Sequence, residues 1–557
     1  MSGTGDIVSR VYGSFRGVDF RGEEISLMRS PDSLNVWKDY TKTDSIRTRP
    51  TMEAKVSFPA PVYGIFFYKG MMMVHSGKKL YTVSSGGQKT IIYEGLKQQE
   101  SNAFVYENKW YFKDGSVYLQ YDGTTIKAVE GYIPTTSIAR KPAGGGTIYE
   151  DVNLLSAIRI NTFLADGTSK EFALDAQNID SGYAPIVKVN GSTVSNYTVS
   201  YTAGKITFNT APAAPATDGQ DNVSVQFSKT TGNDSKILGC TLLQVFDNRV
   251  FFSGNPDYPN TVWHCSLDDP SYCSDLDYYK EGLDEAAVKG LVAGNNVLWV
   301  FREPSDANTT VFYHTPTIDS DYGKIYPSQH SSITTGCIGK AINFNDDIIF
   351  FSDRGMEGIS GDVTTEQAVA HRSSLVDRKL IAEDGYKSMV LAEWEGYLMV
   401  FIGDRAYIAD SRTAFTNENH IEYDWFYWQM EKPITSAKVE DGVLYLGAAD
   451  GVYTLTGEEN IESHWVTPKD KFNAPHLLKT TNKRGCVAEA IGDISVYAKL
   501  EDTDFELIGT YANVTDYFVS RIKRKKFKDI QLKFASQTRF SLETVTLECF
   551  LGGYIKR

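Results

Sequence analysis

The sequence predicts an all-β protein: a β-propeller of about six to seven blades, with a β-sandwich domain inserted into it and a further β-domain at the C-terminal end. Three observations lead to this prediction. Aromatic residues make up 13% of the chain, which favours strands, and the 46 glycines suit tight turns. In addition, one hairpin pattern recurs along much of the chain.

The recurring unit is an apolar or aromatic run, a short polar turn and a second apolar or aromatic run. Seven copies cover residues 62–81, 104–118, 245–252, 291–301, 342–351, 391–401 and 437–446. The last five begin about 46 to 51 residues apart, which suits a four-stranded blade with its loop. Units of this kind bury their apolar face only against neighbouring units, as propeller blades do.

The remaining segments define the domain organisation. Residues 1–55 read as a polar, extended N-terminal leader that lies along other parts of the protein or along a neighbouring subunit. The propeller is expected at 56–132 and 228–463. Short alternating runs separated by turn residues predict an inserted β-sandwich at 133–227 and a C-terminal β-domain at 464–557. Helix is nearly absent, and we expect one short helix at 284–291.

Composition excludes several classes of function. The formal net charge of −14 argues against a surface that as a whole embraces nucleic acid, although an acidic wall would let DNA slide past it. The six cysteines lack the spacing of a zinc ribbon or a disulfide framework, so we expect buried free thiols. The chain contains no run of eighteen apolar residues, and no membrane-spanning segment is predicted.

Catalytic and metal-binding patterns are weak. The densest acidic cluster comprises Asp268, Asp269, Asp275 and Asp277, beside Cys265 and Cys273. Its spacing matches no EF-hand loop, and an exposed acidic loop is the commoner explanation. The sequence also lacks an H-x-x-x-H pair, a Walker loop and a G-x-S-x-G turn. We therefore predict no enzymatic activity and no cofactor. The aromatic run at 425–428 would suit sugar stacking, but core packing is the preferred interpretation.

One basic run stands out on this acidic chain. Its candidate partner-contact residues are Arg521, Lys523, Arg524, Lys525, Lys526 and Lys528. The simpler explanation is an edge strand protected by lysines against unwanted pairing. The density of positive charge exceeds what edge protection requires, so an acidic protein partner is considered beside it. DNA is less favoured as the partner because the rest of the chain is acidic.

Three stretches together resemble tail nozzle or hub proteins of tailed bacteriophages, a family that includes proteins named for stabilising packaged DNA. They are DSLNVW at 32–37 with IRTRP at 46–50; IPTT at 133–136 with RKP at 140–142 and NLL at 153–155; and FKDIQL at 527–532 with GGY at 552–554. In the family the arginine-proline pair is usually followed by glycine, where this chain has Thr51. The turn at that point is therefore expected to differ.

The resemblance implies a structural protein of the virion tail, assembled in the host cytoplasm. Its subunits would form a homo-oligomeric ring, commonly of six, that contacts the portal, the adaptor and other tail proteins. Double-stranded DNA would pass through an acidic lumen without specific binding and be retained there until ejection. Two alternatives stay open: a receptor-binding or baseplate protein that contacts the host cell surface, and a propeller-type polysaccharide depolymerase.

Overall fold

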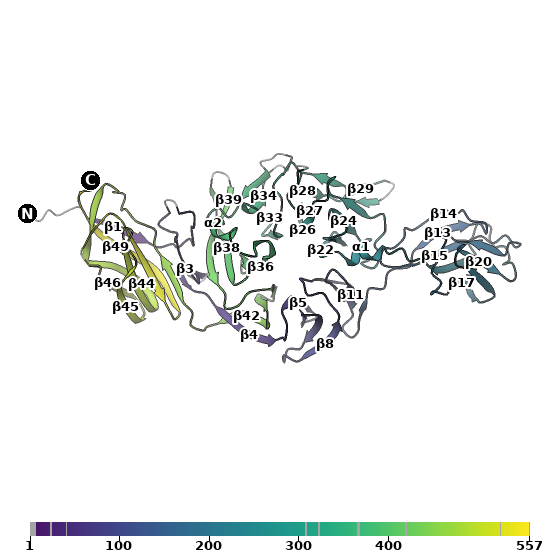
Figure 1. Ribbon diagram of the computed structural model, residues 1–557, viewed down its shortest axis with the longest axis horizontal. Helices are drawn as coiled ribbons and strands as arrows, with labels where there is room; N and C mark the ends of the chain where they lie inside the picture. The colour runs from purple at the N-terminus through teal and green to yellow at the C-terminus, as the bar shows by residue number, and fades with distance from the viewer. Residues whose placement is uncertain are drawn as a thin grey trace, which may run out of the picture. The chain divides into compact units, whose positions relative to one another are not determined.

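The computed structural model describes residues 7–22, 25–39, 42–306, 309–320, 323–361, 363–364, 368–417, 420–523 and 525–555. Strands dominate, as Figure 1 shows, and the described helices are the short α1 (Asp234–Leu238), α2 (Asp377–Leu380) and η2 (Tyr386–Ser388). The chain forms two compact units. Unit 1 comprises Met1–Thr90 and Thr335–Arg557, and unit 2 comprises Ile91–Thr334.

Seven four-stranded sheets within the described ranges form the propeller and confirm the predicted fold class. The sheets of unit 1 are β5 (Val62–Tyr68), β6 (Met71–Ser76), β7 (Lys79–Val83) and β8 (Lys89–Glu94); β32 (Ala341–Phe344), β33 (Asp347–Ser352), β34 (Gly355–Ile359) and β35 (Val369–His371); β36 (Val390–Trp394), β37 (Tyr397–Ile402), β38 (Arg405–Asn417) and β39 (His420–Gln429); and β4 (Thr51–Ser57), β40 (Ser436–Glu440), β41 (Val443–Ala448) and β42 (Gly451–Gly457). In sequence, β8 crosses the boundary at residue 90.

The sheets of unit 2 follow the same plan. They are β9 (Asn102–Tyr106), β10 (Lys109–Lys113), β11 (Tyr118–Tyr121) and β12 (Ile126–Ala128); β22 (Leu242–Phe246), β23 (Arg249–Ser253), β24 (Thr261–His264) and β25 (Tyr278–Lys280); and β26 (Val288–Gly294), β27 (Val297–Arg302), β28 (Val311–His314) and β31 (Ser328–His330). A hairpin of β29 (Thr317–Asp319) and β30 (Gly323–Ile325) precedes β31.

Two-residue turns with positive φ at both positions join the first two strands of each blade. Such turns match the right-handed twist of a hairpin and favour Asn, Asp and Gly. The turns are Lys69-Gly70, Glu107-Asn108, Asp247-Asn248, Asn295-Asn296, Asn345-Asp346, Glu395-Gly396 and Asp441-Gly442. Local turn chemistry therefore explains why the hairpin pattern in the sequence folds into blades.

The inserted domain has a core of its own within unit 2. One sheet contains β13 (Thr135–Arg140), β14 (Thr147–Ile148), β15 (Ile158–Phe163), β17 (Ile186–Val189), β18 (Ser192–Val194) and β21 (Val223–Ser228), and the other contains β16 (Glu171–Ala173), β19 (Tyr197–Ser200) and β20 (Lys205–Phe208). The ring of Phe172 packs edge-on against Phe163 at 5.4 Å and against Phe208 at 5.1 Å.

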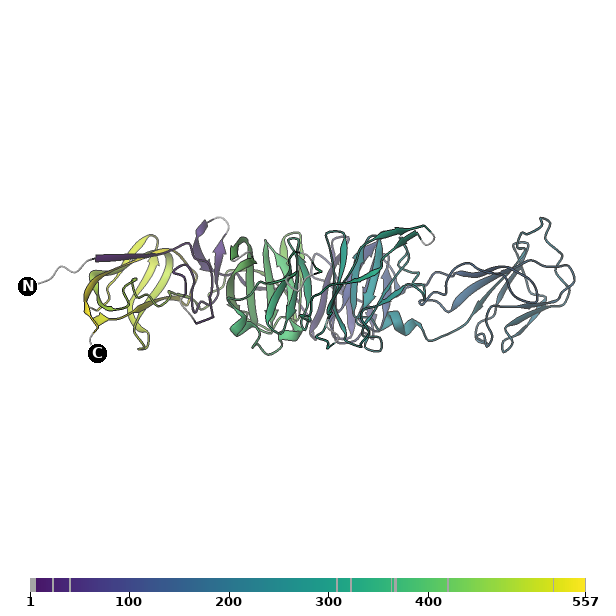
Figure 2. The ribbon, with the colours of Figure 1, turned by 90° about the horizontal axis from the view of Figure 1, so that it is seen from above.

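A ten-stranded sheet of unit 1 joins the two ends of the chain within the described ranges. It contains β1 (Ile7–Tyr12), β2 (Val36–Asp39), β3 (Lys42–Thr48), β43 (Ser463–Val466), β44 (Leu477–Leu500), β45 (Glu506–Val514), β46 (Tyr517–Ser520), β47 (Lys526–Phe527), β48 (Ile530–Ser536) and β49 (Phe540–Tyr554). Figure 2 shows the purple strand β1 beside yellow β49, with which it pairs antiparallel.

The expected leader is thus part of two folded elements of unit 1. Strands β1 to β3 belong to the terminal sheet, and β4 pairs with β42 as the fourth strand of a blade. Of the two locations considered for the leader, the described residues occupy the one along other parts of the same chain. The leader therefore ties the propeller strands of unit 1 to the terminal sheet.

The helix expected at 284–291 is a wrong prediction. Residues 281–287 form a loop, and β26 begins at Val288 and pairs with β27. An isolated helix of so few residues is marginal because its first turn is costly to nucleate. Here the ladder hydrogen bonds of β26 and the burial of Val288 and Leu291 outweigh helical propensity.

Candidate functional site

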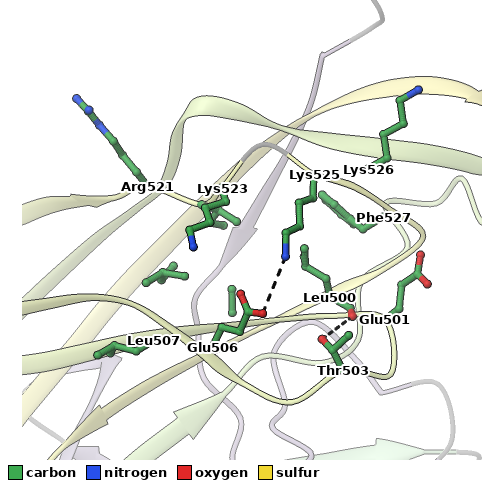
Figure 3. A pocket seen from close by; sticks show the side chains of 13 residues that line it. Leu500, Glu501, Thr503, Glu506, Leu507, Arg521, Lys523, Lys525, Lys526 and Phe527 are labelled. Carbon is green, nitrogen blue, oxygen red and sulfur yellow. Dashed lines mark hydrogen bonds and ion pairs between the residues drawn. The ribbon is translucent and has the colours of Figure 1, made fainter.

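A pocket in the terminal sheet brings most of the basic run together. Its volume is about 310 Å³. Figure 3 shows the lining residues, which come from the end of β44, the following loop, β45, the segment after β46 and β47: Ala498, Leu500, Glu501, Thr503, Glu506, Leu507, Ile508, Arg521, Ile522, Lys523, Lys525, Lys526 and Phe527. The pocket combines an apolar floor with a charged rim.

The floor includes two buried apolar residues that flank most of the basic residues. Ile522 and Phe527 are buried, while Lys523, Lys525 and Lys526 between them are exposed. Phe527 lies on β47, opposite Lys479 of β44, and Ala498 of β44 lies opposite Glu506 of β45. These two pairs lie at opposite ends of the long strand β44, so the pairing alone does not bring them together. The lining of the pocket shows that β45 and the segment after β46 meet around the same hollow.

The rim carries more positive than negative charge. Arg521, Lys523, Lys525 and Lys526 line it, against two carboxylates, Glu501 and Glu506. Figure 3 shows Lys523 and Lys525 pointing towards Glu506, whereas Arg521 and Lys526 project away from it. The closest approach is 4.0 Å between Lys525 Nζ and Glu506 Oε1, and both side chains are more than half exposed. An exposed pair contributes under about 1 kcal/mol, so Lys525 stays available for a partner.

The two remaining predicted residues are Lys528 and Arg524. Lys528 is exposed but does not line the pocket, and its backbone N–H donates to Glu501 Oε1 at 3.1 Å. Arg524 lies outside the described residues. The edge-strand explanation applies to Lys526, because it lies on β47, a two-residue strand that pairs with β44. Arg521 and Lys523 lie outside strands, and edge protection does not account for them.

Sequence reasoning missed Lys479 of β44, whose side chain is hydrogen-bonded to the end of the basic run. Its side chain is buried, and its Nζ donates to Ala474 O at 2.6 Å and to Lys528 O at 2.8 Å. Burial lowers the pKa of Lys479, and the nearby Asp529 and Asp470 oppose that shift. A lysine in an alternating strand carries no sequence signal for burial, so only the tertiary fold identifies it.

The acidic cluster lies in the loop between β24 and β25 of unit 2. Asp269 accepts hydrogen bonds from the backbone N–H and the hydroxyl of Ser271, at 2.8 and 2.6 Å. Burial, together with Asp151 and Asp275 and against Arg249, raises the pKa of Asp277 to about 6. Among the described residues, no group of three or more His, Cys, Asp or Glu side chains is arranged to hold a metal ion.

The cysteines and the aromatic run belong to the core. All six cysteines are buried and free. Trp425, Phe426 and Trp428 of β39 are fully buried, as core packing requires. The indole N–H of Trp425 donates to Arg372 O at 3.3 Å, and that of Trp428 donates to Val36 O at 3.1 Å. These three rings are therefore inaccessible to a sugar ligand, whereas Tyr427 is half-buried.

A second cluster that the sequence did not signal surrounds His371. Its Nε2 lies 2.6 Å from Asp377 Oδ2 and its Nδ1 lies 3.2 Å from Glu357 Oε1. Burial alone would lower the pKa of His371, but the hydrogen bonds to Asp377 and Glu357 outweigh it and raise that pKa to about 10. The Ser373 hydroxyl donates to Asp377 rather than to the ring. A charged imidazolium cannot act as a general base, and its two ion pairs tie β35 to β34 and to α2 within unit 1.

Substituting His371 by Gln is expected to destabilise unit 1 in a pH-dependent way. Because the folded-state pKa is raised, the contribution of the charged ring is fully present below about pH 6.5 and is lost as the pH rises through about 10. About a third of the ring is exposed, so solvent screening limits the effect to roughly 1–2 kcal/mol near pH 6. Denaturant unfolding of both proteins from pH 6 to 10 measures this difference. A difference that stays constant over that range would show that folding does not raise the pKa of His371.

A buried joint in unit 1 connects the leader, the blade β36–β39 and the terminal sheet. Asn35 is central to it. Its Oδ1 accepts hydrogen bonds from Arg49 Nε at 3.0 Å and from the Gln429 backbone N–H at 2.9 Å, and its Nδ2 donates to Glu462 O at 2.9 Å. Arg49 also donates to the backbone carbonyls of Gln429 and Pro50. Nearby, Trp37 stacks on Trp394 and meets Trp428 edge-on.

The comparisons with known proteins add little to this geometry. No protein-family model and no curated protein matches the sequence. Similar solved structures include BamB from Moraxella catarrhalis (11% identity, 77% of this chain and 94% of that chain, TM-score 0.34), the computationally designed Ika8 protein (11% identity, 72% and 98%, TM-score 0.32) and the WD40 domain of Neurospora crassa Pan2 (8% identity, 71% and 89%, TM-score 0.24). These similarities carry no argument about function.

The strand topology and the site together define a class: an all-β propeller protein with an inserted β-sandwich, a terminal sheet formed by both ends of the chain and a basic pocket in that sheet. No helix in the described part of the chain has the length and apolar character of a membrane span.

Proposed function

We propose that this chain is a non-enzymatic structural subunit of a bacteriophage tail. It forms a ring-shaped nozzle or hub, with six subunits expected, below the portal and adaptor. The ring contacts those proteins, channels packaged double-stranded DNA through an acidic lumen without specific binding, and retains it until ejection. The protein is accordingly a component of the virion tail, assembled in the host cytoplasm.

The buried joint is the observation that carries this proposal. The first of the three stretches that resemble nozzle proteins, residues 32–37 with 46–50, supplies Asn35, Trp37 and Arg49 to it. The resemblance thus falls on residues with a specific mechanical role rather than on scattered surface positions. Fully bonded polar networks rigidify a core, and a conduit for packaged DNA needs rigid subunits.

Charge and topology are compatible with the same function. A formal net charge of −14 repels phosphate and lets DNA slide past a wall, which suits a channel better than a DNA-binding surface. A ring of identical subunits uses heterologous interfaces that close by rotation, each of which is expected to bury more than about 1,000 Å². The propeller sheets and the terminal sheet provide the rigid surfaces that such interfaces need.

The test is the oligomeric state of the full chain, alone and with portal and adaptor proteins from the same source. We expect native mass spectrometry and negative-stain imaging to show a closed ring with a central channel, formed by the chain alone or on those partners. A monomer that ignores the portal and adaptor but binds cell-surface glycan would support the receptor-binding alternative. Cleavage of capsular polysaccharide would support the depolymerase alternative, and either result would overturn the proposal.

A further inference from the structure

A loop of unit 2 is fixed by several contacts and yet holds a leucine side chain in water. Leu283 lies between β25 and β26 and is fully exposed. It is flanked by Gly282 on one side and by Asp284 and Glu285 on the other, of which Glu285 is exposed. We call residues 282–285 the acidic leucine loop.

Several contacts hold the acidic leucine loop in place. The fully buried Arg302 pairs with the carboxylate of Asp284, which also accepts a hydrogen bond from the Ser305 hydroxyl. Asn260 Nδ2 donates to Asp284 O at 2.9 Å. Gly282 has φ +78°, and a Cβ at that position would lie 2.2 Å from Arg302 Nη1. Backbone and anchor residues therefore fix the loop in a conformation that leaves Leu283 in water.

A loop that is already ordered loses less conformational entropy on binding than a flexible one. Single exposed leucines are common on protein surfaces, so exposure alone identifies no partner. The chemistry of the loop identifies one: an apolar side chain followed within two residues by an exposed carboxylate. Its complement is an apolar hollow with cations at the rim.

The pocket of the terminal sheet has this complementary chemistry. Its floor includes the buried Ile522 and Phe527, and Leu507 adds an exposed apolar side chain. Lys523 and Lys525 point across the hollow (Figure 3). Among the described residues Lys523 makes no ion pair. Lys525 makes the exposed ion pair with Glu506, at 4.0 Å. A volume of about 310 Å³ lies at the lower end of ligand pockets and suits one or two side chains of a loop.

We propose that the acidic leucine loop of one copy docks into the basic pocket of a second copy of this chain. Leu283 packs on the apolar floor, and Glu285 pairs with Lys523 and Lys525. The two surfaces differ, so the contact is heterologous: the copy that donates its loop keeps a free pocket, and the copy that accepts the loop keeps a free loop, for the next neighbour. This inference rests on the proposed ring and names a contact through which its subunits meet.

Two exposed leucines of the loop between β24 and β25 fit the pocket less well. Leu267 precedes the exposed Asp268, but Leu267 itself is only half exposed, and the carboxylate of Asp269 is already bonded to Ser271. Leu276 lies between Asp275 and Asp277, and both aspartates are only partly exposed. The acidic leucine loop combines a fully exposed leucine with an exposed carboxylate.

Zero-length carbodiimide crosslinking of the full chain tests the contact directly. An equal mixture of ¹⁵N-labelled and unlabelled protein distinguishes bonds between copies from bonds within one copy. We expect amide crosslinks between Lys523 or Lys525 of one isotopic form and Glu285 of the other. Crosslinks from these lysines to Asp268, Asp269, Asp275 or Asp277 in place of Glu285 would overturn the assignment of the loop. A chain that stays monomeric, alone and on its tail partners, would overturn the contact.

Charge reversal supplies a second test, with analytical ultracentrifugation as the readout. Lys523→Glu with Lys525→Glu is expected to weaken self-association at least about tenfold, and so is Leu283→Asp alone. Two matched controls should leave self-association unchanged. They are Lys528→Glu, in the same basic run but outside the pocket, and Leu276→Asp, in the loop between β24 and β25. Adding Glu285→Lys to the double lysine variant should recover part of the loss.

The two proposals fail in different ways. If wild-type rings form and the charge-reversed variants still form them with unchanged affinity, the docking contact is wrong and the nozzle proposal stands. If copies associate through the loop and pocket but build open chains and no ring, the contact stands and the nozzle proposal fails. Binding of inorganic phosphate to the pocket without any crosslink between copies would show an anion site and overturn the docking contact.

Discussion

Replacing Arg49 by Met is expected to destabilise unit 1 by about 3–5 kcal/mol, the range found when one partner of a buried charged network is removed. The Arg49 side chain is 1% exposed and reaches Asn35, Glu431 and two backbone carbonyls. Methionine fills much of the volume but leaves Asn35 Oδ1 and the Gln429 carbonyl with fewer donors. Unpaired buried acceptors lose their hydration without compensation.

The thermal transition of unit 1 measures this effect, with an expected decrease of roughly 5–10 °C in its midpoint. Arg47→Met is the matched control, because Arg47 lies two residues away on β3 and is exposed. Its guanidinium lies 5.8 Å from the Trp37 ring centroid, an interaction that contributes about 0.5–1 kcal/mol at an exposed site. Equal decreases in the transition midpoint for Arg49→Met and Arg47→Met would show that the hydrogen bonds of Arg49 in the buried joint do not stabilise unit 1.

Replacing Gly17 by Ala is the second substitution with a large expected effect. Gly17 has φ +77°, and a Cβ at this position would lie 1.9 Å from the carbonyl oxygen of Trp425. That carbonyl accepts a hydrogen bond from the Val18 N–H at 2.7 Å, and Gly17 O accepts one from Ser30 at 2.8 Å. The clash is with backbone, so the leader itself must move away from β39.

We expect Gly17→Ala to destabilise unit 1 by about 2–4 kcal/mol, from left-handed strain and from overpacking. Hydrogen exchange should show faster opening of the amides of Val18 and Ser30. Gly13→Ala is the matched control, since its Cβ would meet its nearest neighbours, Glu543 O and Thr544 Oγ1, at 3.8 and 3.9 Å. If both alanine variants retain wild-type stability and exchange, the leader is not held against β39 in solution.

The repeated hairpins show how far local sequence carries a prediction. Pairs such as Asp247-Asn248 and Asn295-Asn296 tolerate positive φ, and the apolar runs beside them bury one face of each strand. Both signals lie within about ten residues, so the blades could be predicted without tertiary information. The segment 284–291 shows the limit, because a short stretch with mixed signals follows its tertiary partners.

Only the basic segment of the candidate site could be predicted from the sequence. The charge density of the segment 521–528 marks it in the sequence. The other wall of the pocket, with Glu506 and Leu507, comes from β45, and no spacing rule connects the two segments. Likewise, the exposure of Leu283 depends on Arg302, which reaches the loop from β27.

The sequence by itself determined the all-β character, the turn positions and the recurrence of the blade hairpins, because strand alternation and positive-φ turns are local properties of the chain. Only the tertiary structure decided that β1 pairs with β49, that β4 completes the blade with β42, and that a basic segment faces an apolar floor. Pairings of this kind join residues hundreds of positions apart. They are selected by the burial of whole sheet faces rather than by any nearby residue, so a linear pattern does not contain them.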